Sequence, residues 1–255
     1  MSPMSEVVRY RVDAAIATIT LDSPANRNAI SAALTEQLAG RLSDAAGDPE
    51  VRAVVLTHTG GTFCAGADLS EAGTARPEVM IDLMRLILEL PKPVIGRIDG
   101  HVRAGGFGFV GSCDLVVAGP ASTFALTEVR IGVAPSMISL AVLPRLTSRA
   151  AGRYFLTGEK FDATTAEEIG LITVAATDSA TVDEVVAQWC GDLCKGSPQG
   201  LAAGKKLTTA AILAGFDADA QRLASESAAL FASDEARAGM MAFLNRQSPP
   251  WVVER

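Results

Sequence analysis

The chain has 255 residues, of which 49% are hydrophobic and 20% are charged. This mixture is typical of a folded globular protein, and a chain of this length can bury a full core without disulfides or metals. The formal net charge of −7 argues against a protein that binds nucleic acid, because such proteins need a basic surface. A small anionic ligand is still compatible with this charge, since a few placed N–H groups suffice to hold one.

Cysteine and histidine usage gives no sign of a metal site. The chain has two histidines, His58 and His101, and its cysteines at positions 64, 113, 190 and 194 form no C-x-x-C pair. We therefore expect no metal, and free thiols in a reducing compartment. Glu6 precedes any apolar stretch, which is unlike a signal peptide, and no run of about 18 apolar residues predicts a membrane span. These features favour a cytoplasmic protein.

The first part of the chain alternates predicted strands and helices. Strands are expected over residues 7–12, 14–21, 51–58, 94–98 and 115–119. Ser31 is expected to cap a helix that runs to about Ala46, and a second helix is expected over residues 78–90. Residues 60–70 and 99–108 are predicted loops after buried strands, and the second loop leads into a helix. This alternation is typical of parallel strands joined by crossover helices.

After about Leu140 the pattern becomes mainly helical. Helices are expected over residues 149–157, 165–169, 182–195, 198–214 and 217–232, with a strand-like segment at 172–175. The sequence therefore predicts an α/β core over residues 1–195 and a helical C-terminal region over 196–255. Because no low-complexity linker separates them, we expect this region to pack onto the core or onto another subunit.

The two predicted loops carry small residues, which allow the backbone to approach a ligand or another chain segment closely. In open α/β sheets, ligands bind at the carboxyl ends of the strands, which is where both loops lie. The segment GGFG (105–108) does not match the phosphate-binding pattern G-x-G-x-x-G. The spacing alone leaves two interpretations open: glycines of tight turns, or backbone N–H groups that converge as an oxyanion hole.

Several motifs, taken together, carry a resemblance to a known family. They are SPANRNAI (23–30), FCAGADL (63–69), DGHVRAGGFGF (99–109), SCDLVVA (112–118), TEVRIGVAP (127–135), LTGEKFDA (156–163), EIGLI (168–172) and AGMMAFLNR (238–246). In this order and spacing the chain resembles the crotonase family, the enoyl-CoA hydratase/isomerase superfamily, along nearly its whole length.

The resemblance implies a fold, a substrate class and an assembly. The implied fold is α/β, a crotonase-like ββα superhelix of two near-perpendicular sheets with a helical C-terminal trimerisation region. The implied substrate is an acyl-CoA thioester, with no separate cofactor because coenzyme A is part of the substrate. The implied assembly is a homotrimer or homohexamer, without a nucleic-acid or membrane partner.

The resemblance also implies catalytic roles. The backbone N–H groups of Ala67 and Gly105 would hold the thioester oxygen, and Glu128 would be the acid and base. Glu128 has apolar neighbours, and a carboxylate in such a setting is costly to bury unless it is paired or working. A surface ion pair between Glu128 and Arg130 is the alternative that the residues alone slightly favour.

Further residues are expected to bind the substrate or its CoA portion. They are Asn26, Arg27, Ala65, Asp68, Leu69, Arg103, Phe243 and Arg246. The Ala65 carbonyl would accept from the adenine amino group, and Arg27 and Arg246 would contact CoA phosphates. Asp68 alternatively orders its own loop, and Arg246 is equally compatible with the surface of a tail helix. Arg103 would pair with a substrate carboxylate or a CoA phosphate, or be a solvated loop charge.

One departure from the family pattern bears on which reaction the protein catalyses. Well-known family hydratases carry a second Glu three residues after Gly105, where this chain has Gly108. A single carboxylate can add water to a 2-enoyl thioester, or it can move a proton between Cα and Cγ, and the missing Glu favours the second task. The surrounding motifs most resemble bacterial members with Gly here, several of which are similar to hydratases of branched or carboxylated substrates such as methylglutaconyl-CoA. We therefore expect an enoyl-CoA hydratase, with a Δ3-Δ2-enoyl-CoA isomerase or a catalytically idle acyl-CoA-binding protein as alternatives.

Overall fold

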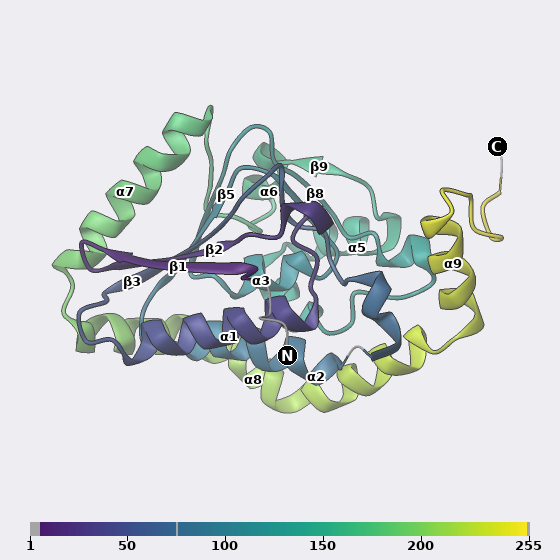
Figure 1. Cartoon of the computed structure of the whole chain (residues 1–255), viewed down its shortest axis with the longest axis horizontal. Coiled ribbons are helices and arrows are strands. Elements are labelled where there is room, and N and C mark those ends of the chain that lie inside the picture. Colours follow the sequence, from purple (N-terminus) through teal and green to yellow (C-terminus); the bar gives the residue numbers. More distant parts are fainter. Residues whose placement is uncertain (1–5, 75, 254–255) are drawn as a thin grey trace.

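The computed structural model describes residues 6–74 and 76–253, and a large β-sheet organises the first part of the chain (Figure 1). Its strands follow the order β1-β2-β3-β5-β7-β10. They are β1 (Val8–Asp13), β2 (Ile16–Leu21), β3 (Ala53–His58), β5 (Val94–Ile98), β7 (Leu115–Ala118) and β10 (Val174–Ala175). β1 and β2 are antiparallel, whereas the later strands run parallel to their neighbours. The prediction of parallel strands is confirmed.

The edge and the centre of this sheet differ in burial. Ala14 and Ala15 join β1 to β2 with positive φ angles of 46° and 66°, the conformation of a hairpin turn that matches strand twist. Buried positions alternate along β2, so one face packs on the core. In β3, residues 53–56 are all buried, as expected for a parallel strand covered on both faces.

Helices cover the sheets and continue to the C-terminal end. They are α1 (Ala32–Gly47), α2 (Pro77–Glu89), α3 (Gly106–Ser112), α4 (Ser139–Val142), α5 (Ser148–Thr157), α6 (Ala163–Glu168), α7 (Ser179–Lys195), α8 (Pro198–Phe231) and α9 (Asp234–Leu244). The predicted cap of α1 is confirmed, because the Ser31 hydroxyl accepts from the Leu34 N–H at 3.2 Å. Figure 1 shows α8 passing along α2 and leading into α9 at one end of the molecule.

The two helices expected over residues 198–214 and 217–232 form one continuous helix, α8, so that expectation is wrong. The expected break lies at Gly215, where a built Cβ meets no described atom within 4 Å. On the inner side Ile212 and Phe216 are buried, and the Arg85 guanidinium of α2 lies 5.5 Å from the Phe216 ring. Burial of this face keeps the helix continuous through a residue of low helix propensity.

A buried ion pair anchors α8 near its start. Lys205 Nζ lies 2.7 Å from Asp114 Oδ2 and donates to the carbonyls of Ile87 and Lys92 at 2.7 and 3.1 Å. Asp114 Oδ2 also accepts from the Val94 N–H at 2.7 Å. Because Asp114 precedes β7, Ile87 belongs to α2 and Lys92 precedes β5, these contacts pack the C-terminal helical region onto the core.

A smaller sheet lies partly in the segments expected to be loops. Its strands, in spatial order, are β4 (Thr62–Cys64), β6 (His101–Arg103), β8 (Thr123–Ala125) and β9 (Phe161–Asp162). The loop predictions for 60–70 and 99–108 are wrong over β4 and β6, because three residues are too few to show an alternating pattern. β4, β6 and β8 run parallel to one another, so their carboxyl ends meet at one edge of the sheet.

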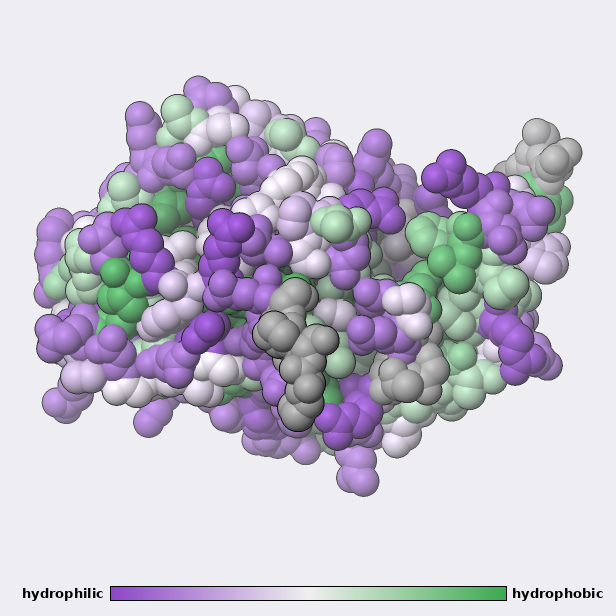
Figure 2. Space-filling model, viewed as in Figure 1, coloured by the Kyte–Doolittle hydropathy of each residue, from purple (hydrophilic) through white to green (hydrophobic). Residues whose placement is uncertain are grey.

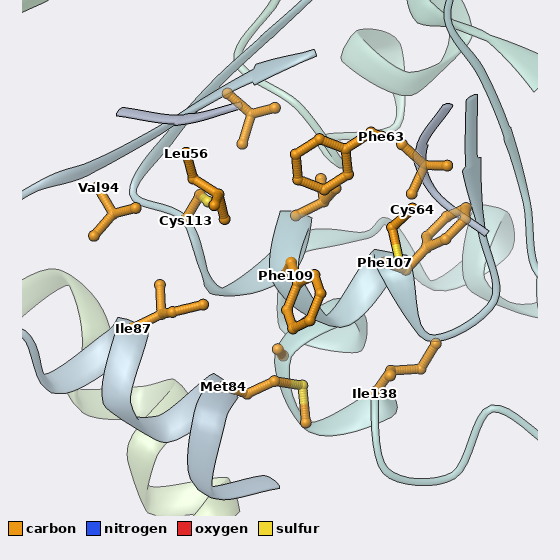
Figure 3. Close-up of a cluster of buried hydrophobic side chains, with 14 of the residues drawn as sticks. Leu56, Phe63, Cys64, Met84, Ile87, Val94, Phe107, Phe109, Cys113 and Ile138 are labelled. Atoms are coloured by element: carbon orange, nitrogen blue, oxygen red, sulfur yellow. The ribbon is translucent and has the colours of Figure 1, made fainter. Parts of the chain in front are cut away.

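The core between the sheets and α2 is centred on α3, whose residues are all buried. Figure 3 shows Phe107 and Phe109 extending from α3, with Phe63 above them and Met84 and Ile138 below. These side chains are buried members of one continuous hydrophobic cluster. The helix that follows Gly105 is therefore fixed by packing on several sides.

The surface is mostly polar, with an apolar area near the C-terminal end. Met241, Phe243 and Leu244 of α9 are 55%, 55% and 59% exposed. Figure 2 shows apolar atoms gathered at the end of the molecule where Figure 1 places α9. Across the described residues, no helix combines the length and the apolar character needed to cross a membrane.

Candidate active site

A groove of about 1450 Å³ opens beside the carboxyl ends of β4, β6 and β8. Its walls come from the start of α1, from α2, from residues 127–138, from the end of α8 and from α9. The residues expected from the sequence that line this groove are Asn26, Arg27, Ala65, Ala67, Asp68, Leu69, Arg103, Gly105, Glu128 and Phe243. Arg246 is not among the described residues of the lining.

Three neighbouring parallel strands deliver the three residues expected to be catalytic. Ala67 follows the end of β4, Gly105 follows the end of β6, and Glu128 follows the end of β8. All three line the groove. The parallel pairing of short strands thus brings together residues that lie far apart in the sequence.

The N–H of Ala67 faces away from the neighbouring chain segment. The Ile30 N–H donates to the Gly66 carbonyl at 2.8 Å, and the Asp68 N–H donates to the Ile30 carbonyl at 3.2 Å. In this parallel bridge the two bonds flank Ala67, so its own N–H points to the opposite side. That side is occupied by Gly105, because a Cβ built on Gly105 would lie 3.9 Å from the Ala67 nitrogen.

The two glycine-bearing loops touch with no room for a side chain between them. Gly66 has φ +89°, a conformation that favours glycine, and a Cβ there would lie 2.8 Å from the Ala104 Cβ and 3.5 Å from the Gly105 nitrogen. Gly105 is the N-cap of α3, so its N–H belongs to the helix terminus, where N–H groups have no intrahelical acceptor. The arrangement brings the main-chain nitrogens of Ala67 and Gly105 close together in the wall of the groove.

Glu128 opens a single 3₁₀ turn, η3 (Glu128–Ile131), and its side chain enters the protein interior. It is only 7% exposed, and its Oε2 accepts no hydrogen bond from the described part of the chain. Burial raises the pKa of this carboxyl to about 7. The surface pair with Arg130 is not formed, because Arg130 is exposed and donates to the Thr157 carbonyl at 3.4 Å.

Position 108 is enclosed by apolar side chains. A Cβ built on Gly108 would lie 2.6 Å from Met80 Cε, 2.7 Å from Met84 Sδ and 3.0 Å from Ile138 Cγ2. Figure 3 shows Met84 and Ile138 on the same side of α3. The position where the resemblance leads us to expect a second carboxylate is therefore surrounded by two methionines of α2 and an isoleucine.

Asp68 has the contacts of a carboxylate that orders its loop. Its Oδ1 accepts from the Ser70 N–H at 3.0 Å and from the Ser70 hydroxyl at 2.6 Å, and its Oδ2 accepts from Asn26 Nδ2 at 3.2 Å. These hydrogen bonds, above all those from Ser70, hold the pKa of Asp68 below its usual value. The Asn26–Asp68 hydrogen bond thus joins the loop of residues 23–30 to the loop of residues 60–70.

Asn28 is a site-building residue that sequence reasoning missed. It is fully buried, its Nδ2 donates to the carbonyls of Thr59 and Thr62 at 3.1 and 2.8 Å, and its Oδ1 accepts from the Ser23 N–H at 2.7 Å. Its position within the motif SPANRNAI is the signal that could have identified it. An amide with these three bonds fixes the loop of residues 23–30 against the segment that leads into β4.

The basic candidates differ in their freedom to meet a ligand. Arg27 is exposed at the groove, with φ 59°. Arg103 also lines the groove, but its guanidinium donates to Val102 and Thr123 within the chain. Arg246 is exposed just after α9, whereas Phe243 of α9 reaches the lining. Their contacts with a substrate stay predictions.

The cysteines are free thiols. Burial raises the pKa of both Cys64 and Cys113 to about 12, so these thiols stay protonated and unreactive. Within residues 6–74 and 76–253 no group of His, Cys, Asp or Glu is arranged to hold a metal ion.

Comparison with known proteins gives one consistent result. The structure is similar to that of an enoyl-CoA hydratase from Mycobacterium avium, with 61% identity, a TM-score of 0.91 and coverage of 98% of this chain and 100% of the other. It is also similar to a carnitinyl-CoA hydratase from the same species, with 28% identity, a TM-score of 0.86 and coverage of 97% and 99%. The 2,3-dehydroadipyl-CoA hydratase of Escherichia coli K12 is 29% identical over an alignment that covers 96% of this chain and 98% of the relative.

The family model described as enoyl-CoA hydratase/isomerase matches residues 11–254. The match spans both sheets, the groove and the C-terminal helices, and the solved relatives share the crotonase fold with this chain. The chain belongs to the enoyl-CoA hydratase/isomerase family.

Proposed function

We propose that this protein is an enoyl-CoA hydratase, a lyase that adds water across the double bond of a 2-enoyl-CoA thioester. The observation that carries the proposal is the buried Glu128, whose Oε2 has no hydrogen-bond partner among the described residues. Glu128 lines the same groove as Ala67 and Gly105, whose backbones lie close together. A carboxylate kept desolvated at an opening of this kind is suited to proton transfer. Coenzyme A enters as part of the substrate, and no cofactor takes part.

In the proposed complex the N–H groups of Ala67 and Gly105 hold the thioester oxygen. As water adds, that oxygen gains enolate charge, and two preorganised donors stabilise it by about 3 kcal/mol each. The rest of the substrate would be held by the Ala65 carbonyl at the adenine, by Arg27 and Arg246 at the phosphates, and by the ring of Phe243. Leu69 and the Asn26–Asp68 pair would shape the same binding surface.

Glu128 would carry both proton transfers. It takes a proton from water as the hydroxyl oxygen attacks C3, and the electron pair of the double bond moves toward the thioester oxygen. Glu128 then returns its proton to C2 on the same face, so the product has gained one water and Glu128 is regenerated. A carboxyl whose pKa is about 7 can take and return a proton near neutral pH.

The isomerase remains the alternative that a specific observation favours. Moving a proton from Cα to Cγ of a 3-enoyl thioester needs one carboxylate and no water. The apolar enclosure of Gly108 by Met80, Met84 and Ile138 leaves no second carboxylate to hold a water there. The idle acyl-CoA-binding protein is less well supported, because a buried carboxylate without a structural partner is costly to keep.

One side of the groove, where the acyl group would lie in the proposed complex, indicates which substrates to try first. Met80 and Leu83 of α2 and Met137 and Ile138 make this side apolar, which suits alkyl and branched acyl groups. Arg76, one turn before Met80 on the same lining, is the cation that a carboxylated acyl group such as methylglutaconyl would meet. Both classes belong to the proposal.

We also propose a homotrimer or homohexamer. The support is the group of exposed apolar side chains formed by Met241, Phe243 and Leu244 on α9, because exposed apolar residues that cluster are typical of protein–protein contacts. Sedimentation of the purified protein would test the assembly. A cytoplasmic location stays a prediction.

The decisive experiment is a turnover panel in oxygen-18 water, read by mass spectrometry. The purified protein would be offered 2-hexenoyl-CoA, 3-hexenoyl-CoA and 3-methylglutaconyl-CoA. Gain of one labelled water on a 2-enoyl ester supports the hydratase. Conversion of the 3-enoyl ester to a 2-enoyl ester of the same mass, without labelled oxygen, supports the isomerase. Tight binding without turnover supports the idle protein.

A further inference from the structure

A connected set of hydrogen bonds surrounds Arg103, whose role the mechanism above leaves open. Its Nη1 donates to the Val102 carbonyl at 2.8 Å and to the Thr123 carbonyl at 2.6 Å, and its Nη2 donates to the Thr123 hydroxyl at 2.7 Å. The same hydroxyl lies 2.9 Å from His101 Nδ1. Arg103 is half-buried, so it is not a solvated loop charge.

The strand register explains why these side chains meet. His101 and Arg103 are two apart on β6, so they project from the same face of the small sheet, opposite to the buried Val102. β8 lies parallel beside β6, with Arg103 paired to Ala125. Thr123, two residues before Ala125, lies on this same face, within reach of both side chains.

The two strands joined by Arg103 lead into different halves of the site. β6 leads through Ala104 to Gly105, and β8 leads within three residues to Glu128. The guanidinium therefore ties the strand that precedes an oxyanion donor to the strand that precedes the acid/base residue. Its donors are directed at main-chain and hydroxyl oxygens, which fixes the relative position of the strands.

The turn between Arg103 and Gly105 is strained. Ala104 has φ 46°, in the left-handed region that non-glycine residues occupy at a cost of about 1–2 kcal/mol. Such a conformation persists only when the structure on both sides holds it. On one side α3 is buried, and on the other the Ala104 N–H donates to the Ala125 carbonyl at 3.1 Å, beside the Arg103 contacts.

We propose that Arg103, acting through Thr123, is a positioning residue for the oxyanion hole: it holds the strained turn that orients the Gly105 N–H and keeps it in register with Glu128. This inference rests on the proposed function, because it assumes that the Gly105 N–H binds the thioester oxygen. It also gives Arg103 a role that needs no contact with the substrate.

His101 completes the network from the solvent side. The Thr123 hydroxyl accepts from Arg103 and so has its own proton free to donate to His101 Nδ1, which requires a neutral imidazole. Burial and the nearby charges of Arg103 and Lys160 lower the pKa of His101, which favours the neutral ring. His101 thus supports the orientation of the Thr123 hydroxyl.

The test uses a conjugated dienoyl-CoA, whose absorbance shifts to longer wavelength when its carbonyl is polarised. Arg103→Met is expected to lower kcat for the 2-enoyl substrate by 10- to 100-fold and to reduce this red shift, while the Kd for a saturated acyl-CoA changes less than about threefold. Arg103→Lys should retain part of the red shift that Arg103→Met loses, because an ammonium group reaches some of the same oxygens but lacks the planar set of donors of the guanidinium. Arg149→Met, at an exposed position of α5, is the matched control and should behave as wild type.

Thr123→Val provides a milder variant, should Arg103→Met fail to fold. It removes the hydroxyl that joins Arg103 to His101, keeps the Thr123 carbonyl and nearly keeps the side-chain volume, and it should reduce the red shift in the same direction. An unchanged kcat and an unchanged red shift in Arg103→Met would overturn the inference. So would a loss of affinity for the CoA ester with the red shift intact, because Arg103 would then contact the substrate. A wild-type protein with neither turnover nor red shift would instead overturn the proposed function.

Discussion

Gly108 faces Met84 at the contact between α3 and α2, where a Cβ on the glycine would lie 2.7 Å from the methionine sulfur. Met80 approaches the same point from one turn earlier on α2. The glycine and the two methionines therefore form a matched set, in which a small residue on one helix admits large ones from the other. Of this set Met80 lines the groove, so the groove is apolar beside the position where the resemblance leads us to expect a second carboxylate.

The Gly108→Glu substitution is therefore expected to impair the protein and not to improve it. The new carboxylate would have to displace two methionines and would be buried among apolar atoms, at a cost of at least about 2 kcal/mol in the free energy of unfolding. Urea denaturation would measure the loss, and Gly108→Ala would separate crowding from charge. An increase in hydration rate for Gly108→Glu would contradict this account of the packing.

Glu128→Gln tests the acid/base assignment. The amide keeps the size of the side chain but cannot take a proton from water, so kcat should fall by about 10²- to 10⁴-fold. Binding of a saturated acyl-CoA should be retained, because the proposed oxyanion donors belong to the backbone. Steady-state kinetics and calorimetric titration would measure the two quantities. A variant with wild-type kcat would exclude Glu128 as the proton carrier.

The same carboxyl should make stability depend on pH. Burial raises its folded-state pKa from the ordinary 4.5 to about 7, so between these values the folded protein holds a proton that the unfolded chain releases. The free energy of unfolding should therefore fall as pH rises from about 4.5 to 7, by about 3 kcal/mol from this group. Denaturation of wild type and Glu128→Gln across this window would isolate the effect, since the other titrating groups are shared. Parallel curves for the two proteins would refute it.

Gly239→Ala tests the contact between α9 and the turn that bears Glu128. A Cβ at Gly239 would lie 2.5 Å from the backbone C and O of Ile131, and neither atom can move aside by changing a rotamer. The variant should lose about 1–3 kcal/mol of stability and lower kcat, because η3 must shift. Gly215→Ala, in open space on α8, is the control and should gain up to about 1 kcal/mol. Equal effects of the two substitutions would argue that the α9 contact is unimportant.

Long, regular segments were predictable from the sequence because their patterns repeat. The buried stretch of β3 and the start of α1 at Ser31 both came from local signals, a run of apolar residues and a cap. The groove residues were predictable from family motifs, and the structure brings Ala67, Gly105 and Glu128 to one place. Local pattern alone would have left the pairing of Glu128 with Arg130 as the preferred interpretation.

The rest depended on contacts between distant segments. The strand β6 is three residues long, so only its pairing with β4 and β8 defines it. The Arg103–Thr123 bonds depend on that register, and no local signal reports it. Similarly, the packing of Met84 on Gly108 arises from the approach of two helices, and α8 stays continuous through Gly215 because Phe216 is buried.

The proposed donors at positions 67 and 105 belong to the main chain, and this has a consequence for how the family's chemistry can diversify. A main-chain N–H is present whatever side chain evolution places beside it, with proline as the exception. Mutation can therefore replace or relocate the carboxylates around the groove while the main-chain N–H groups proposed to bind the thioester oxygen are retained. Gly108 illustrates the point: the resemblance leads us to expect a carboxylate at this position, and this chain has apolar packing there, whereas no ordinary side-chain substitution deletes the main-chain N–H groups at positions 67 and 105.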